Sequence, residues 1–108
     1  MDLLTIPEAA DALGLPVNRV HQQLRDGHLV GVRNDAGVRC VPAAFIADGV
    51  VVKSLASVIT QLRDAHYTDD EIVEWLFRAD DSLPGTPIEA LRANRGSEVK
   101  RRAQVAGF

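Results

Sequence analysis

Two short amphipathic helices separated by a turn of about three residues constrain this 108-residue chain more than any other feature. The first helix begins at a capping box in which Thr5 caps the helix and Glu8 reaches back to the cap backbone. Apolar residues then recur at helical spacing, and these are Ile6, Ala9, Ala10 and Leu13. Residues 14–16 (Gly-Leu-Pro) end this helix and turn the chain into the second.

The second helix is predicted over residues 17–25 and has two unlike faces. Val17, Val20 and Leu24 share one side, and we expect all three to be buried. His21 lies at the edge of this side, where a packed role is favoured over a contact role. The other side carries amide and guanidinium groups, which hydrogen-bond base edges and phosphates in DNA complexes. These candidate contact residues are Asn18, Arg19, Gln22, Gln23 and Arg25.

A β-hairpin is predicted directly after the second helix, which ends at Gly27. Residues 29–33 and 38–41 are predicted strands, joined by the turn residues 34–37 (Asn-Asp-Ala-Gly). Two helices at this spacing followed by a hairpin form a winged helix-turn-helix, in which the second helix enters the major groove of DNA. Residues 33–39 are then the wing, and its candidate contact residues are Arg33, Asn34 and Arg39.

The motifs of these segments resemble known winged-helix proteins. The run 5–10 (Thr-Ile-Pro-Glu-Ala-Ala), together with the hairpin, resembles the MerR/excisionase type of winged helix. The runs 22–30 and 51–55 are similar to those of a family of small actinobacterial winged-helix DNA-binding proteins. This resemblance implies double-stranded DNA as the partner and a role in transcription regulation. Some relatives carry an N-terminal tail that can be phosphorylated; because this chain begins close to its first helix, the resemblance does not carry that regulation over, and regulation by phosphorylation stays open.

The second half of the chain is predicted to be helical. We expect a winged helix-turn-helix domain over residues 1–50 and a helical C-terminal domain over residues 51–108. Two further capping boxes, at 68–71 and 86–89, begin helices, the first of which is expected to bury Trp75. Further expected features are caps at Ser54 and Ser97 and a helix break at Gly96.

A second resemblance keeps another function open. The pattern of Trp75-Leu76, Thr86-Pro87 and Val99 resembles the C-terminal domain of Xre/MbcA/ParS-type antitoxins, which implies an interaction fold. The alternative to DNA binding is therefore an antitoxin-like adaptor that binds protein and not DNA. A homodimer contact or a protein partner through the C-terminal domain stays open.

The charge distribution favours a local DNA surface on an acidic protein. The chain has 12 Lys and Arg against 15 Asp and Glu, a net charge of −3. Residues 17–39 hold 4 Arg against 2 Asp, so the remainder has 12 − 4 = 8 basic and 15 − 2 = 13 acidic residues. A second basic cluster is solvated surface, an auxiliary phosphate contact or a partner contact. It comprises Arg92, Arg95, Lys100, Arg101 and Arg102.

No feature of the sequence predicts catalysis, and we expect neither an enzyme nor a cofactor. A Gly-rich phosphate loop, a metal-spaced His/Cys set and a nucleophile elbow are all missing from the sequence. The acids at 69–71 begin a helix, where they are favoured electrostatically. Cys40 is expected to be a buried, inert thiol. With no signal sequence and no apolar run near 18 residues, we expect a cytoplasmic protein without a membrane contact.

Overall fold

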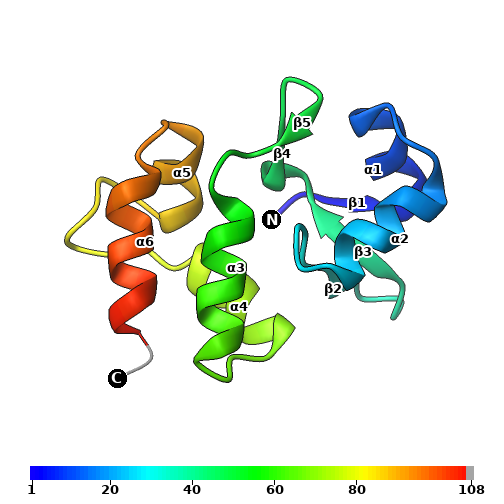
Figure 1. Cartoon of the computed structure of the whole chain (residues 1–108). Helices are drawn as coiled ribbons and strands as arrows, with labels where there is room; N and C mark the ends of the chain where they lie inside the picture. Colours follow the sequence, from blue (N-terminus) through cyan, green and yellow to red (C-terminus); the bar gives the residue numbers. More distant parts are fainter. Residues whose placement is uncertain (107–108) are drawn as a thin grey trace.

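The computed structural model describes residues 1–106, and it confirms a mostly helical fold with small antiparallel sheets (Figure 1). The N-terminal elements are β1 (Leu3–Thr5), α1 (Ile6–Leu13), α2 (Val17–Arg25), β2 (Val32–Arg33) and β3 (Arg39–Pro42). A 3-10 turn η1 (Ala43–Phe45) and a two-stranded sheet of β4 (Ile46–Ala47) and β5 (Val50–Val51) follow. The remaining helices are α3 (Leu55–Asp64), α4 (Asp69–Leu76), α5 (Pro87–Arg92) and α6 (Gly96–Val105).

The three predicted capping boxes are all present, at the starts of α1, α4 and α5. In α1, the Thr5 backbone N–H donates to Glu8 Oε1 at 2.8 Å, and the Glu8 N–H donates to Thr5 Oγ1 at 3.3 Å. The bond from the Thr5 backbone, more than that from its side chain, lowers the pKa of Glu8 because it stabilises the ionised carboxylate. Gly14 then ends α1 in the left-handed region at φ 64°.

The main sheet has three strands in the order β1-β3-β2, one more than the predicted hairpin. Strand β1 pairs antiparallel with β3, so that Thr5 lies opposite Cys40, whose thiol is buried as predicted. The predicted strand over 29–33 is shorter in the structure, because Leu29 and Val30 turn into the core before the chain reaches the sheet. The first strand thus ties the start of α1 to the wing.

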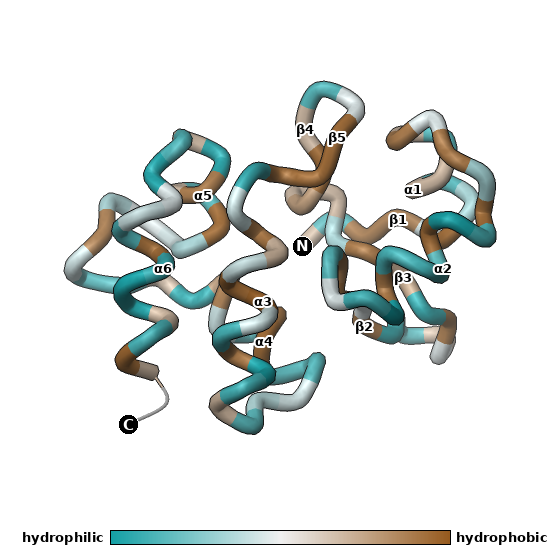
Figure 2. Tube along the Cα trace, in the orientation of Figure 1, coloured by the Kyte–Doolittle hydropathy of each residue, from teal (hydrophilic) through white to brown (hydrophobic). Residues whose placement is uncertain are grey.

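The helical second half and the winged half share one core. Buried side chains form a single hydrophobic cluster that includes Leu24 of α2 and Leu55 of α3. Arg92 of α5 also donates to the backbone carbonyls of Ala44 and Ile46, at 2.9 and 3.1 Å. Along the trace, β1 and β5 are hydrophobic, whereas α2 is largely hydrophilic (Figure 2). Only Val20 and Leu24 of α2 are buried, so most of the surface of this helix is polar and faces solvent.

The start of α6 differs from the expectation. Gly96 does not break a helix but is the first residue of α6, and Arg95 rather than Ser97 occupies the N-cap. A Cβ on Gly96 would lie 2.6 Å from Ser54 Oγ, so the close approach of the two segments requires glycine. Ser54 does precede α3, but its backbone is left-handed (φ 73°) and its hydroxyl makes no capping hydrogen bond.

Helix α4 also differs at Trp75, which is only partly buried. The core side of α4 is formed by Ile72, Val73 and Leu76. Trp75 instead borders a shallow hollow beside Tyr67 at the surface. Its large ring covers the flank of α4 without filling the core.

The division into domains over 1–50 and 51–108 stays a prediction, and residues 107–108 lie outside the described part of the chain. Across residues 1–106, no helix combines the length and the apolar character needed to cross a membrane. The same residues contain no group of three or more His, Cys, Asp or Glu side chains placed to hold a metal ion.

Candidate nucleic-acid interface

Helix α2 packs on α1 after the predicted short turn. The Leu15 backbone N–H donates to the Ala10 carbonyl oxygen at 3.0 Å and closes this turn. Val20 and Leu24 are 0% and 2% exposed, so they fix α2 on the core. The opposite side of the helix is therefore held toward solvent.

The buried pair determines which side chains of α2 point outward, because successive helical residues turn by about 100°. Asn18, Gln22 and Arg25 lie on the far side of the helix from this pair, and all three are exposed. Arg19 is exposed on one flank, whereas Gln23 on the same flank is half-buried. We call Asn18, Arg19, Gln22 and Arg25 the outer face of α2. The structure therefore presents four of the five predicted contact residues of α2 together.

Two predictions about the other flank of α2 are wrong. Val17 is 41% exposed rather than buried, because it is the first residue of the helix and projects past the core. His21 is exposed rather than packed, so it lies beside the outer face and joins the candidate contact residues. The spacing of the apolar residues did not predict the exposure of His21, because a residue at the edge of an apolar stripe is buried only if a neighbouring element covers it.

The wing is a tight turn that uses its own polar side chains. Asn34 Oδ1 accepts from the backbone N–H groups of Ala36 and Val38, both at 2.9 Å. Arg33 donates through Nη1 to the Gly37 carbonyl oxygen at 2.8 Å, across the turn. Asn34 is thus a turn-forming residue with its oxygen occupied, while the Arg33 and Arg39 side chains are exposed.

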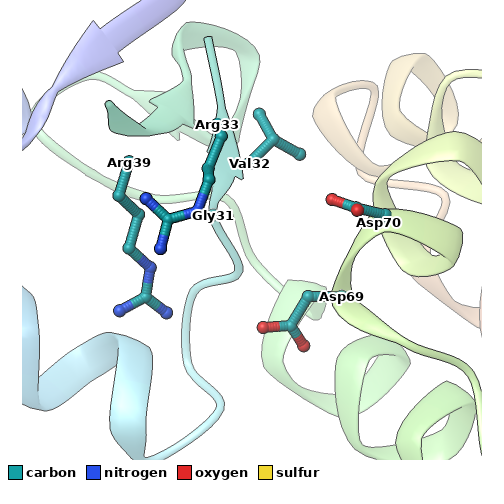
Figure 3. Close-up of a pocket in the computed structure, with 6 residues that line it drawn as sticks. All are labelled: Gly31, Val32, Arg33, Arg39, Asp69 and Asp70. Carbon is teal, nitrogen blue, oxygen red and sulfur yellow. The ribbon is translucent and has the colours of Figure 1, made fainter. Parts of the chain in front are cut away.

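A hollow of about 370 Å³ separates the wing from the start of α4. Arg33 and Arg39 line its wing side, and Asp69 and Asp70 line the opposite side (Figure 3). Asp69 pairs with Arg63 of α3 at 3.0 Å. Among residues 1–106, neither wing arginine forms an ion pair with these carboxylates. The acids of the second half therefore lie close enough to weaken the positive potential of the wing without neutralising it by contact.

The sequence did not reveal this arrangement of charges. The acids at 69–71 are explained locally by the start of α4, and the wing arginines lie about thirty residues earlier. Only the packing of α4 beside β2 brings the two groups to one hollow. The described residues thus place an acidic border beside the basic wing.

Comparison with known proteins matches both halves of the chain to one family. Residues 1–46 match the family model described as the wHTH domain of DNA-binding protein Rv2175c. Residues 52–107 match the model described as the Rv2175c C-terminal domain of unknown function. DNA-binding protein Rv2175c of Mycobacterium tuberculosis (strain ATCC 25618 / H37Rv) is 44% identical over 115 residues, covering 95% of this chain and 79% of that protein.

The fold is also similar to a solved structure. The NMR structure of Rv2175c superposes with a TM-score of 0.90 at 42% identity, covering 99% of this chain and 82% of the other. The similarity therefore extends over the winged half and the helical half together. It confirms a winged helix-turn-helix followed by a helical C-terminal region.

Proposed function

This chain belongs to the Rv2175c family of winged-helix proteins, and from that premise we propose that it binds double-stranded DNA and regulates transcription. The relative that shares 44% identity is itself named a DNA-binding protein. Binding, and not catalysis, is the activity proposed, and no cofactor enters it. Because bacterial DNA lies in the cytoplasm, we expect the protein to work there.

The outer face of α2 is the observation that carries this proposal. Its four side chains are exposed, and none makes a side-chain hydrogen bond or ion pair with another of residues 1–106. A helix of 9 residues is about 14 Å long, comparable to a major groove about 12 Å wide. A rigid helix that presents unpaired amides and guanidinium groups fits the edges of base pairs in that groove.

The residues of this face divide into two roles. Asn18 and Gln22 carry amides, which pair in bidentate fashion with the N6 and N7 atoms of adenine. Arg19 and Arg25 carry guanidinium groups, which bind phosphate oxygens or the O6 and N7 atoms of guanine. Half-buried Gln23 lies at the margin of the contact and contributes less than Gln22.

The wing is proposed to contact the neighbouring DNA backbone. Arg33 and Arg39 supply the charge, and Asn34 shapes the turn that holds them. Such phosphate contacts position a protein on the duplex and carry no sequence information themselves. They make the binding constant fall with salt, by a log–log slope of about −0.9 for each contact.

A titration by fluorescence anisotropy tests the proposal. The protein is added to a labelled duplex of about 20 base pairs, two turns of DNA, at salt concentrations from about 50 to 200 mM. We expect binding that weakens with salt, and a loss of about tenfold or more in the Arg19→Ala/Gln22→Ala variant. Arg78→Ala, which removes an exposed arginine that follows α4 and pairs with Glu74, is the matched control.

The outcome also separates the two candidate functions. A wild-type protein that does not bind duplex DNA at the lower salt would contradict the proposal and leave the adaptor hypothesis. Binding that survives in the Arg19→Ala/Gln22→Ala variant would show that α2 is not the reading helix. Selection from a random-sequence duplex library, repeated with Asn18→Ala, then tests whether the amides read bases.

A further inference from the structure

The structure separates the five basic residues near the C-terminus by what they contact. Arg92 binds the backbone of the winged half, as described above. Arg95 pairs with Glu98 at 2.7 Å. Arg102 donates from Nε to Ser82 Oγ at 2.7 Å, and its other nitrogens bind backbone carbonyls. Arg92 and Arg102 therefore join segments that are distant in the sequence, whereas Arg95 is held by a local ion pair.

Lys100 and Arg101 make no ion pair or side-chain hydrogen bond within the described part of the chain. They point in different directions from α6. Val99 and Ala103 are the buried side of this helix, and a turn of about 100° per residue places Arg101 almost opposite them. Lys100 instead lies on one flank, half-buried, beside α3.

Lys100 lines an open hollow of about 450 Å³ with Asp26 and His28, which lie at the end of α2. Helix α3 lies between α6 and the end of α2 (Figure 1). It supplies most of the residues that line the hollow, and we call them the floor. The floor side chains are small or polar, and they are Ala56, Ser57, Thr60 and Gln61. A basic side chain from the far end of the sequence is thus placed beside the C-terminal end of the proposed reading helix.

Asp26, the C-cap of α2, connects the hollow with the exposed side of that helix. Asp26 follows Gln22 by one helical turn, so it continues the outer face of α2, and it also borders the hollow. The length of α2 is close to the width of the major groove. A helix that lies across the groove therefore ends near one of the two DNA backbones. The hollow is therefore where that backbone would pass.

We propose that Lys100 contacts a phosphate of the same duplex that α2 enters, so that the C-terminal half extends the DNA footprint. The inference rests on the proposed function of α2. The hydroxyl of Ser57 is a further side-chain donor that lines the same hollow, whereas the hydroxyl of Thr60 donates to the Ala56 carbonyl oxygen at 3.0 Å. Asp26 repels a phosphate there, and the Lys100 ammonium supplies the opposite charge that offsets it.

The test compares Lys100→Ala with the wild-type chain on the labelled duplex described above. We expect the log–log salt slope to fall by about 0.9 and the affinity to fall about five- to tenfold at about 0.1 M salt, equally on all sequences. Lys100→Arg should retain binding, because it keeps the charge. Arg101→Ala removes the same charge one residue along and should change the affinity far less.

A crosslinking measurement supplies a second readout that does not depend on affinity. A photoactivatable group on Lys100→Cys should crosslink to the duplex, and the same group on Arg101→Cys should not. Cys40 is buried, so labelling is directed to the introduced thiol. Unchanged binding and slope in Lys100→Ala, or no crosslink from position 100, would overturn the inference while wild-type binding keeps the proposed function. If the wild-type protein does not bind the duplex at all, both the inference and the proposed function are overturned.

Discussion

Arg63 of α3 pairs with Asp69 of α4 at 3.0 Å, and its Nη1 atom lies 2.9 Å from the position of a Cβ on Gly27. Gly27 itself has φ 77°, in the left-handed region that favours glycine. The turn that ends α2 is thus in contact with an ion pair of the second half. The end of α2, the proposed reading helix, therefore lies against the second half of the chain.

Gly27→Ala should lower the free energy of unfolding for two reasons. The left-handed backbone costs an alanine about 1–2 kcal/mol. Displacement of Arg63 from Asp69, a partly exposed pair, costs up to about 1 kcal/mol more. Urea unfolding measures the sum. Gly37→Ala is the matched control, because Gly37 has φ 79° but no atom within 4 Å of an added Cβ. Equal losses of unfolding free energy in the two variants would show that the Arg63 contact contributes nothing.

Asp70→Asn should strengthen DNA binding. Asp70 faces Arg33 and Arg39 across the hollow in Figure 3, so its carboxylate lowers the potential that attracts phosphates. We expect about a two- to threefold gain in affinity at low salt that shrinks as salt screens the charge. Anisotropy titration measures it, with Glu74→Gln on the exposed side of the same helix as the control. A gain of equal size in the control would mean that only net charge matters.

Ser54→Gly should stabilise the protein and rescue Gly96→Ala. Ser54 has φ 73°, and its Oγ atom would lie 2.6 Å from a Cβ on Gly96. Gly96→Ala alone should lose about 1–3 kcal/mol of unfolding free energy through overpacking. The double variant should recover most of that loss, because the clashing side chain is gone. Thermal or urea unfolding of the wild type, the two single variants and the double variant gives the coupling energy directly. If the two single changes in unfolding free energy simply add in the double variant, the contact is contradicted.

Acid should destabilise the fold through the capping boxes. Hydrogen bonds from the Thr68 backbone, and then from its side chain, lower the pKa of Glu71 below its ordinary value of 4.5. A carboxylate whose pKa is lower in the folded than in the unfolded state stabilises the fold when the pH is above its unfolded pKa. This stabilisation is lost as the pH falls through the pKa of the folded state. Glu71→Gln can still accept in the box but does not titrate. Between about pH 5 and pH 3, its melting temperature should therefore fall less than that of the wild type.

The sequence predicted those parts of the fold that depend on neighbours along the chain. Thr5 with Glu8, and the equivalent pairs that start α4 and α5, form boxes within four residues, so the pattern alone identifies them. The turn at 14–16 and the wing turn at 34–37 are equally local. From these the winged helix-turn-helix followed directly.

The features that the sequence did not predict depend on contacts between distant segments. Strand β1 has only 3 residues and becomes a strand because β3 lies beside it. Gly96 was expected to break a helix, but its role is to let Ser54 approach. His21 was expected to pack, but its side chain is exposed in the described part of the chain. The choice of Asn18, Gln22 and Arg25 as contact residues stays a prediction.

The two halves of the chain share one core and are joined by the Arg92 hydrogen bonds to Ala44 and Ile46. This has a consequence for the spacing of DNA sites that two copies of the protein could bind together. Within residues 1–106, α2 and the helices of the second half are packed into one hydrophobic cluster. If two copies associate through their C-terminal halves, the distance between their α2 helices is set by the fold. Half-sites would then have to be spaced by whole turns of about 10 base pairs, and inserting half a turn between them would abolish joint binding.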